Sequence, residues 1–291
     1  MTNEPRTTKN ARREAAREAA RVAREQQKRR ETRTKILVRG GVTLAIVLVA
    51  ALIGISIWGA TRGGEAATTA GPANMISEGI VLTGSNGEIT AVSTPALQPG
   101  EDPVPTDDAT LDAPLHIVTY VDYFCPVCNA FEQTNGHAIE ALVSAGQASL
   151  EVHPVAILNR NSQGTNYSTR SGNAMACVAQ YAPDKFLDAQ GVLFANQPAE
   201  GTSGLTDGQL VDLVQGAVGD NPNIATCIRG NTFGGFIDAA TQRAVNDPAL
   251  VNPSSGGFGT PTVLVNGDRY NGAVNDPAAF STFLQEHMPA N

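Results

Sequence analysis

Apolar and polar positions divide the chain into three stretches with different periodicity. Residues 10–35 are dense in Ala, Arg, Glu, Gln and Lys, which are strong helix formers, and their apolar positions are mostly alanine. Residues 40–61 form a continuous run without a charged side chain. From residue 79 onward, short runs rich in β-branched residues alternate with helical patterns. The sequence therefore predicts a basic helix, an apolar helix and a larger α/β domain.

The charge-free run at 40–61 predicts a transmembrane helix. At 1.5 Å per residue it would be about 33 Å long, which is enough to cross the hydrocarbon core of a bilayer. Trp58 lies near its far end, where an interface anchor is expected. A cleaved signal peptide has a shorter apolar core and a short basic start, so we interpret the run as a signal anchor. Cleavage near residues 67–70 stays open as an alternative.

Charge is distributed unevenly along the chain, whose net charge is −8. Residues 1–39 contain thirteen Lys or Arg and five Glu, whereas residues 63–291 contain six basic and 23 acidic residues. By the positive-inside rule, the basic arm at 1–39 stays in the cytoplasm and the part after residue 62 is exported. A basic arm can bind nucleic acid, or it can lie near anionic headgroups, where each basic side chain contributes about 1 kcal/mol. We favour the membrane-flanking arm, because a basic cytoplasmic flank is what orients an anchor of this kind.

The exported part is expected to consist of a tether and one domain. Residues 62–78 are small and turn-prone, which predicts a flexible tether. Residues 79–291 carry strand patterns on both sides of a long helical stretch at about 170–250. Because that stretch is too long for an ordinary crossover connection, we expect it to be a helical subdomain inserted into the sheet fold.

Strand and helix signals within this domain follow a regular order. Asn-Gly pairs predict hairpins near residues 79–92 and 260–270. The buried strands at 115–123 and 149–158 flank a helix, and a right-handed crossover would make them parallel. The expected helices are 125–145, 171–181, 184–196, 207–218, 222–229, 232–245 and 276–288.

The candidate chemistry lies at the junction between the first buried strand and its helix, in Cys125-Pro126-Val127-Cys128. Unpaired N–H groups and the helix dipole favour an anion at a helix N-terminus. We therefore expect the pKa of the Cys125 thiol to lie below its free value of about 8.5. Cys128, three residues on, is close enough to attack a mixed disulfide on Cys125. A proline is tolerated in the first helical turn, where its missing N–H costs nothing.

Two alternatives for this motif are half of a zinc site and an inert pair. The other two cysteines, Cys177 and Cys227, are solitary, and no second CxxC or His pair has zinc-finger spacing. All four cysteines lie on the predicted exported side, where an even count indicates disulfides. We therefore favour redox chemistry. The sequence also shows no motif for a bound cofactor.

The pattern resembles the DsbA-like family of thioredoxin-fold thiol:disulfide oxidoreductases, in its membrane-anchored bacterial form. The resemblance rests on the helical insertion and on Tyr120-Val121-Asp122-Tyr123-Phe124-Cys125-Pro126-Val127-Cys128 and Gly259-Thr260-Pro261-Thr262. It implies a thioredoxin-like fold in which Pro261 is cis and faces the CxxC. It also implies that the backbone of Thr260 binds substrate as an added strand. An ordinary trans proline beginning an edge strand is the alternative.

Three positions qualify this resemblance. Many relatives carry a buried acid six residues before the first cysteine, where this chain has Thr119, and strongly oxidising members carry a histidine where it has Val127. A less oxidising potential is therefore expected. Asp122 matches a frequent family residue, for which we predict local hydrogen bonding. Cys177 and Cys227 are expected to form a structural disulfide; two free buried thiols are the alternative.

The resemblance implies a membrane-tethered enzyme that forms disulfides in exported proteins through Cys125 and Cys128. Its expected partners are reduced exported polypeptides and a quinone-linked membrane oxidase, and no nucleic acid. One alternative is a disulfide reductase or isomerase with the same fold. Another is a tethered binding protein in which the CxxC has no catalytic role.

Overall fold

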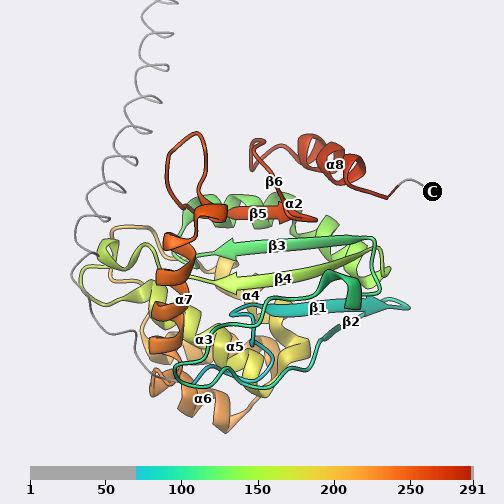
Figure 1. Ribbon diagram of the computed structural model, residues 1–291. Helices are drawn as coiled ribbons and strands as arrows, with labels where there is room; N and C mark the ends of the chain where they lie inside the picture. The colour runs from blue at the N-terminus through green and yellow to red at the C-terminus, as the bar shows by residue number, and fades with distance from the viewer. Residues whose placement is uncertain (1–69, 290–291) are drawn as a thin grey trace, which may run out of the picture. The chain divides into compact units, whose positions relative to one another are not determined.

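The computed structural model describes residues 70–289 (Figure 1). The predicted arm at 1–39 and anchor at 40–61 lie outside the described residues. Within 70–289, no helix is both long enough and apolar enough to cross a membrane. The strands are β1 (Ile80–Ser85), β2 (Glu88–Ala91), β3 (Leu115–Val121), β4 (Ala148–Pro154), β5 (Thr262–Val265) and β6 (Asp268–Arg269). The helices are α2 (Pro126–Ser144), α3 (Tyr167–Tyr181), α4 (Phe186–Ala195), α5 (Asp207–Val218), α6 (Pro222–Arg229), α7 (Gly234–Asn246) and α8 (Pro277–Glu286), with short 3₁₀ turns at Asp108–Thr110, Asn159–Asn161, Pro183–Lys185 and Pro248–Leu250.

The strands form one mixed sheet in the order β2-β1-β4-β3-β5-β6 (Figure 1). The central strands β3 and β4 are parallel and joined by α2, which confirms the predicted parallel arrangement. Every other neighbouring pair is antiparallel. Ile117 lies opposite Leu150 of β4 and Val265 of β5, and all three side chains are buried. An apolar run of this kind suits a strand that is covered on both faces.

Both predicted hairpins are present, and each turns at its Asn-Gly pair. Asn86 and Gly87 have φ values of 55° and 89°, and Asn266 and Gly267 have values of 49° and 88°. A two-residue turn with positive φ at both positions matches the right-handed twist of the strands, and Asn followed by Gly adopts it with little strain. The second hairpin turn follows Val265 and therefore fixes where β5 ends.

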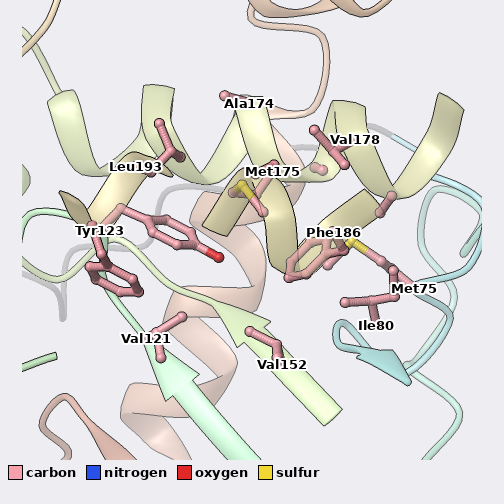
Figure 2. Packing of buried hydrophobic residues seen from close by; sticks show 14 of the residues in the cluster. Met75, Ile80, Val121, Tyr123, Val152, Ala174, Met175, Val178, Phe186 and Leu193 are labelled. Carbon is pink, nitrogen blue, oxygen red and sulfur yellow. The ribbon is translucent and has the colours of Figure 1, made fainter. Parts of the chain in front are cut away.

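Five helices, α3 to α7, lie between β4 and β5, so the structure contains the predicted helical insertion. The insertion shares one core with the sheet. Tyr123, which follows β3, Phe186 of α4 and Met175 of α3 are fully buried in the same cluster (Figure 2). Full burial of a large apolar side chain contributes about 1.5–3 kcal/mol. The insertion is therefore packed onto the carboxyl end of β3, and is not an independent domain.

The insertion also contains a disulfide between Cys177 of α3 and Cys227 of α6, whose Cα atoms are 5.9 Å apart. Both cysteines are buried, with exposed fractions of 0% and 4%. In the chain-entropy description, closing a loop of this length stabilises the fold by about 4 kcal/mol. The disulfide fastens two helices of the insertion and lies apart from the CxxC.

The part of the predicted tether that the structure describes, residues 70–78, is packed against the domain. Met75 is fully buried. The Ala73 N–H donates to Gln180 Oε1 at 2.8 Å, and Asn74 Nδ2 donates to the Ala179 carbonyl at 2.9 Å. The prediction of flexibility was therefore wrong for these nine residues. The small and polar composition of this stretch gave no sign that Met75 is buried, or that its hydrogen-bond partners, the Gln180 side chain and the Ala179 carbonyl, lie about a hundred residues away.

Candidate active site

Cys125 occupies the point where the chain leaves β3 and enters α2. Its N–H donates to the Asp122 carbonyl at 2.9 Å, which closes the turn after the strand. Cys125 is then the N-cap of α2, with φ −80° and ψ 115°, and Pro126 takes the first helical position. The two residues between the cysteines are exposed, whereas only 6% of Cys125 and 1% of Cys128 is exposed. The dithiol therefore lies just beneath a short exposed turn.

The two thiols have opposite acidities. The pKa of Cys125 is lowered, chiefly by a hydrogen bond from the Cys128 thiol, with smaller contributions from Thr260 and from the Cys128 backbone N–H; burial opposes this shift. The pKa of Cys128 is raised well above its usual value, mainly by burial and also by the neighbouring Cys125. Only a thiolate is an effective nucleophile. Cys125 is therefore suited to react first, and Cys128 to remain protonated until a mixed disulfide forms beside it.

The segment before β5 faces this pair. The Thr260–Pro261 peptide bond is cis, and the Cys125 thiol donates to the Thr260 carbonyl with an Sγ–O distance of 3.5 Å. Antiparallel pairing of β5 with β3 brings the two segments together across more than a hundred residues of sequence. The structure thus gathers Cys125, Cys128, Thr260 and Pro261 at one place.

Asp122 is a fully buried carboxylate beneath the same turn. Its Oδ1 accepts from the Phe124 N–H at 2.9 Å and its Oδ2 accepts from the Leu158 N–H at 3.0 Å. The bond from Phe124 confirms the predicted local role, whereas the bond from Leu158 joins Asp122 to the segment after β4. Burial raises the pKa of Asp122 to about 6, although the hydrogen bonds oppose that shift. When ionised, Asp122 also opposes the thiolate of Cys125 through charge repulsion.

Two glutamines of the insertion reach this region, and sequence reasoning missed both. Gln190 of α4 accepts from the Tyr123 hydroxyl at 3.1 Å. Gln197, which follows α4, donates to the carbonyl oxygens of Tyr123 and Cys125 at 3.0 Å each. Neither residue belongs to a motif, and both lie more than sixty residues from their partners. Only the fold brings them to the active-site turn.

A cleft of about 430 Å³ lies elsewhere. Its lining includes His116 and Tyr120, which alternate with the β3 residues that face α2, so the cleft is on the opposite face of the sheet. Its polar groups pair with each other: Glu151 contacts His116 at 3.2 Å and His153 at 3.0 Å. Within residues 70–289, no group of His, Cys, Asp or Glu side chains is arranged to hold a metal ion.

Comparison with known proteins gives the chain its context. Residues 110–286 match the sequence model of the family described as Thioredoxin. The serine/threonine-protein kinase PknE of Mycobacterium tuberculosis is 32% identical over 155 residues, which are 52% of this chain and 26% of the kinase. The chain thus spans about a quarter of the length of that relative.

Two solved structures from Mycobacterium tuberculosis are similar in fold and in sequence. Reduced DsbA is 27% identical with a TM-score of 0.52, and the match covers 72% of this chain and 91% of DsbA. The reduced disulfide bond oxidoreductase DsbG is 26% identical with a TM-score of 0.52, and the match covers 72% of this chain and 88% of DsbG. The two likenesses are nearly equal.

Proposed function

We propose that this chain, which belongs to the thioredoxin family and is DsbA-like, is a thiol:disulfide oxidoreductase that forms disulfides in exported proteins. The observation that carries the proposal is the unequal pair of thiols. Cys125, with its lowered pKa, caps α2 and faces Thr260, while Cys128 is buried beside it with a raised pKa. Because of this asymmetry, Cys125 can form the mixed disulfide with a substrate and then leave as a thiolate, while Cys128 can re-form the disulfide with Cys125.

In the proposed reaction a substrate thiolate attacks Sγ of Cys125 in the oxidised pair. The Cys125–Cys128 bond breaks, a mixed disulfide forms, and Cys128 takes up a proton as a thiol. A second substrate thiolate then attacks the substrate sulfur and releases Cys125 as a thiolate. A lowered pKa makes Cys125 a good leaving group. The substrate loses two electrons and the enzyme ends as a dithiol, which a membrane oxidant must reoxidise.

We also propose that residues 40–61 anchor the enzyme in the membrane, with residues 1–39 in the cytoplasm and the catalytic domain outside. The uneven charge of the chain supports this orientation. The Cys177–Cys227 disulfide supports an oxidising compartment. On this proposal the substrates are reduced exported polypeptides, and by family resemblance the oxidant is a quinone-linked membrane protein.

Electron flow in the opposite direction is the second candidate. Val127, between the cysteines, adds no positive charge that would stabilise the thiolate, which leaves room for a reducing role. A measured potential near −270 mV, the value of thioredoxin, would favour a reductase. A potential closer to the value of about −120 mV for DsbA would favour disulfide formation.

The test is oxidation of a reduced model substrate by the full chain in detergent or vesicles. Cys125→Ser is expected to abolish the activity. In Cys128→Ser, the Cys125 thiolate should attack a model substrate supplied with its disulfide intact, release one substrate thiolate and accumulate as a mixed disulfide, because no second enzyme thiol is present to resolve it. Cys177→Ala combined with Cys227→Ala is the matched control and should keep the activity while the protein stays folded. Equal oxidation by the wild type and Cys125→Ser would instead support a binding protein whose CxxC is not catalytic.

A further inference from the structure

Gln197 makes an unusual set of contacts with the active-site turn. It lies at the start of the loop between α4 and α5, in the helical insertion. Its Nε2 donates to the main-chain carbonyls of Tyr123 and Cys125, each at 3.0 Å, and its Oε1 accepts from Asn129 Nδ2 at 3.3 Å. The Gln197 amide is thus hydrogen-bonded to a carbonyl before Cys125, to the Cys125 carbonyl and to a side chain near the start of α2.

We propose that Gln197 is a positioning residue of the CxxC, which fixes the direction of the Cys125 carbonyl and with it the orientation of the first turn of α2 relative to the Cys125 sulfur. This inference rests on the proposed thiol chemistry and adds to it a contact from the helical insertion. Among the described residues, the hydrogen bonds of the Gln197 side chain go to two main-chain carbonyls and to Asn129, and none goes to a sulfur atom. It therefore acts through the geometry of Cys125.

The effect follows from the position of Cys125 as the N-cap. The direction of its carbonyl is set by ψ, which is 115°. The same torsion decides whether the N–H groups of the first helical turn point at Sγ. The Cys128 thiol is the main cause of the lowered pKa of Cys125, and the Cys128 backbone N–H adds to it. A rotation about ψ would turn that N–H away from the sulfur and so disfavour the thiolate.

The Gln197 amide has a second effect of the same sign. Two carbonyl oxygens close to Cys125 place partial negative charge beside the sulfur, and the donor group of Gln197 faces both of them. A carbonyl without its donor opposes a nearby anion more strongly. Buried carbonyls also need a partner. Within residues 70–289, the only other donor to either oxygen is the helical N–H of Asn129, which reaches the Cys125 carbonyl at 3.2 Å.

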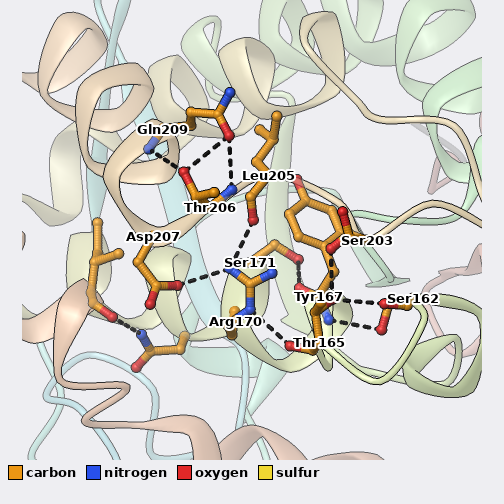
Figure 3. Close-up of polar contacts among 12 residues, drawn as sticks. Ser162, Thr165, Tyr167, Arg170, Ser171, Ser203, Leu205, Thr206, Asp207 and Gln209 are labelled. Carbon is orange, nitrogen blue, oxygen red and sulfur yellow. Dashed lines mark hydrogen bonds and ion pairs between the residues drawn. The ribbon is translucent and has the colours of Figure 1, made fainter.

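The loop that carries Gln197 is also held at its far end, independently of this contact. Arg170 of α3 donates to the carbonyls of Thr165 and Leu205 and pairs with Asp207 at 2.8 Å (Figure 3). The Thr206 side chain caps α5 through a reciprocal bond with Gln209 (Figure 3). Loss of the Gln197 side chain should therefore leave the loop in place, so a change at Cys125 reports the lost contact.

The experiment measures the pKa of Cys125 in the reduced full chain from the ultraviolet absorbance of the thiolate and from the rate of alkylation against pH. Because Cys177 and Cys227 form a disulfide, Cys125 and Cys128 are the only cysteine thiols of the chain that titrate. Gln197→Ala is expected to raise the pKa of Cys125 by about 0.5–1 unit, which lowers the alkylation rate below the pKa by roughly three- to tenfold. Gln197→Glu keeps the length and the Oε1 acceptor but adds negative charge, and should raise the pKa at least as much.

Gln163→Ala is the control, because Gln163 Nε2 also donates to a main-chain carbonyl of this loop, that of Gly201 at 2.8 Å. It should leave the pKa of Cys125 unchanged. An unchanged pKa in both Gln197 variants would overturn the inference, and so would an equal shift in Gln163→Ala. If Gln197→Ala does not fold, Gln197→Glu decides alone. Because these readouts concern the thiol itself, a failed inference is distinguishable from a failed proposal of oxidase activity, which substrate oxidation by the wild type tests.

Discussion

The two cysteine pairs of this chain are buried almost equally, yet only one is suited to exchange. Exposed fractions are 6% and 1% for Cys125 and Cys128, and 0% and 4% for Cys177 and Cys227. The first pair is a dithiol in the structure and the second is a disulfide. Burial of the residue therefore does not decide which pair is reactive.

Position within a helix separates them. Cys125 caps α2, where main-chain N–H groups lack intrahelical partners and favour an anion. Cys177 lies inside α3 and Cys227 inside α6, where the N–H groups are used by the helices themselves. Exposed residues also border the first pair, so a second sulfur can approach Cys125. A reactive cysteine thus needs main-chain N–H groups without helical partners near its sulfur, and an exposed approach by which a second sulfur can reach it.

The largest expected difference between the two cysteine pairs is the loss of folding stability when each pair is removed. Replacing Cys177 and Cys227 together by alanine should lower the free energy of unfolding by about 4 kcal/mol, because the unfolded chain gains the freedom of a long loop. The exchange activity should persist below the new melting temperature. Urea unfolding and substrate oxidation measure the two quantities.

Replacing Cys125 and Cys128 together by alanine is the crossed control. It should abolish exchange and change the free energy of unfolding far less, because the loop between these two cysteines holds only two residues. A large loss of stability in this variant would contradict the division of roles. So would loss of exchange in the folded Cys177/Cys227 variant.

A smaller effect is expected from adding charge beside the reactive pair. Val127 is 44% exposed between the cysteines, so Val127→His should be tolerated. A protonated imidazole there would stabilise the thiolate and lower the pKa of Cys125 by about one unit, which corresponds to a potential about 30 mV more oxidising. The shift should fade as pH rises above the histidine pKa of about 6.5. Redox titration against glutathione measures it.

Val104→His is the matched control for that change, since Val104 is an exposed valine outside the site, with 53% of its surface accessible. It should leave the potential unchanged. An unchanged potential in Val127→His at pH 6 would mean that charge at this position does not reach the sulfur. A less oxidising potential would contradict the proposed sign.

Local signals were sufficient to predict most helices and strands and the position of the CxxC at the start of α2. The Asn-Gly turns, the buried runs of β3 and β4 and the strand-to-helix position of Cys125 all depend on residues close in sequence. Helices α5 and α6 match their predicted bounds, because Thr206 and Asn221 cap them and Pro222 begins the second. A helix boundary that depends on a capping residue, as these two do, can be predicted from the sequence.

Contacts between distant segments were not predictable in the same way. Gln197 is an ordinary polar loop residue until the insertion folds against the turn after β3. Met75 lies in a small, turn-prone stretch that gives no sign of the core beneath it. Nor does the sequence show that Asp122 is fully buried, although its place beside the CxxC indicated a local role. Each of these depends on tertiary packing, for which a single sequence has no periodic signal.

The smallest expected effect concerns the buried carboxylate of Asp122. It tests whether the charge of Asp122, in addition to the N-terminus of α2, influences the pKa of Cys125. Burial raises the pKa of Asp122 to about 6, so the group is ionised above that pH and then opposes the thiolate. Asp122→Asn should lower the pKa of Cys125 by about half a unit, roughly 0.7 kcal/mol. Lowering the pH through 6 neutralises Asp122 in the wild type. The thiolate curve of the wild type should therefore be broader than a single ionisation, and that of Asp122→Asn should not.

Asp184→Asn provides the comparison for this measurement, because Asp184 also accepts from a main-chain N–H, that of Ala91 at 2.9 Å, but on the exposed surface. Its thiolate curve should coincide with that of the wild type. Should Asp122→Asn also coincide, charge beneath the turn does not reach the sulfur, and the helix N-terminus with its neighbours accounts for the acidity. A higher pKa of Cys125 in Asp122→Asn would show instead that the hydrogen bonds to Phe124 and Leu158 outweigh the charge, because asparagine offers only one oxygen to the two donors.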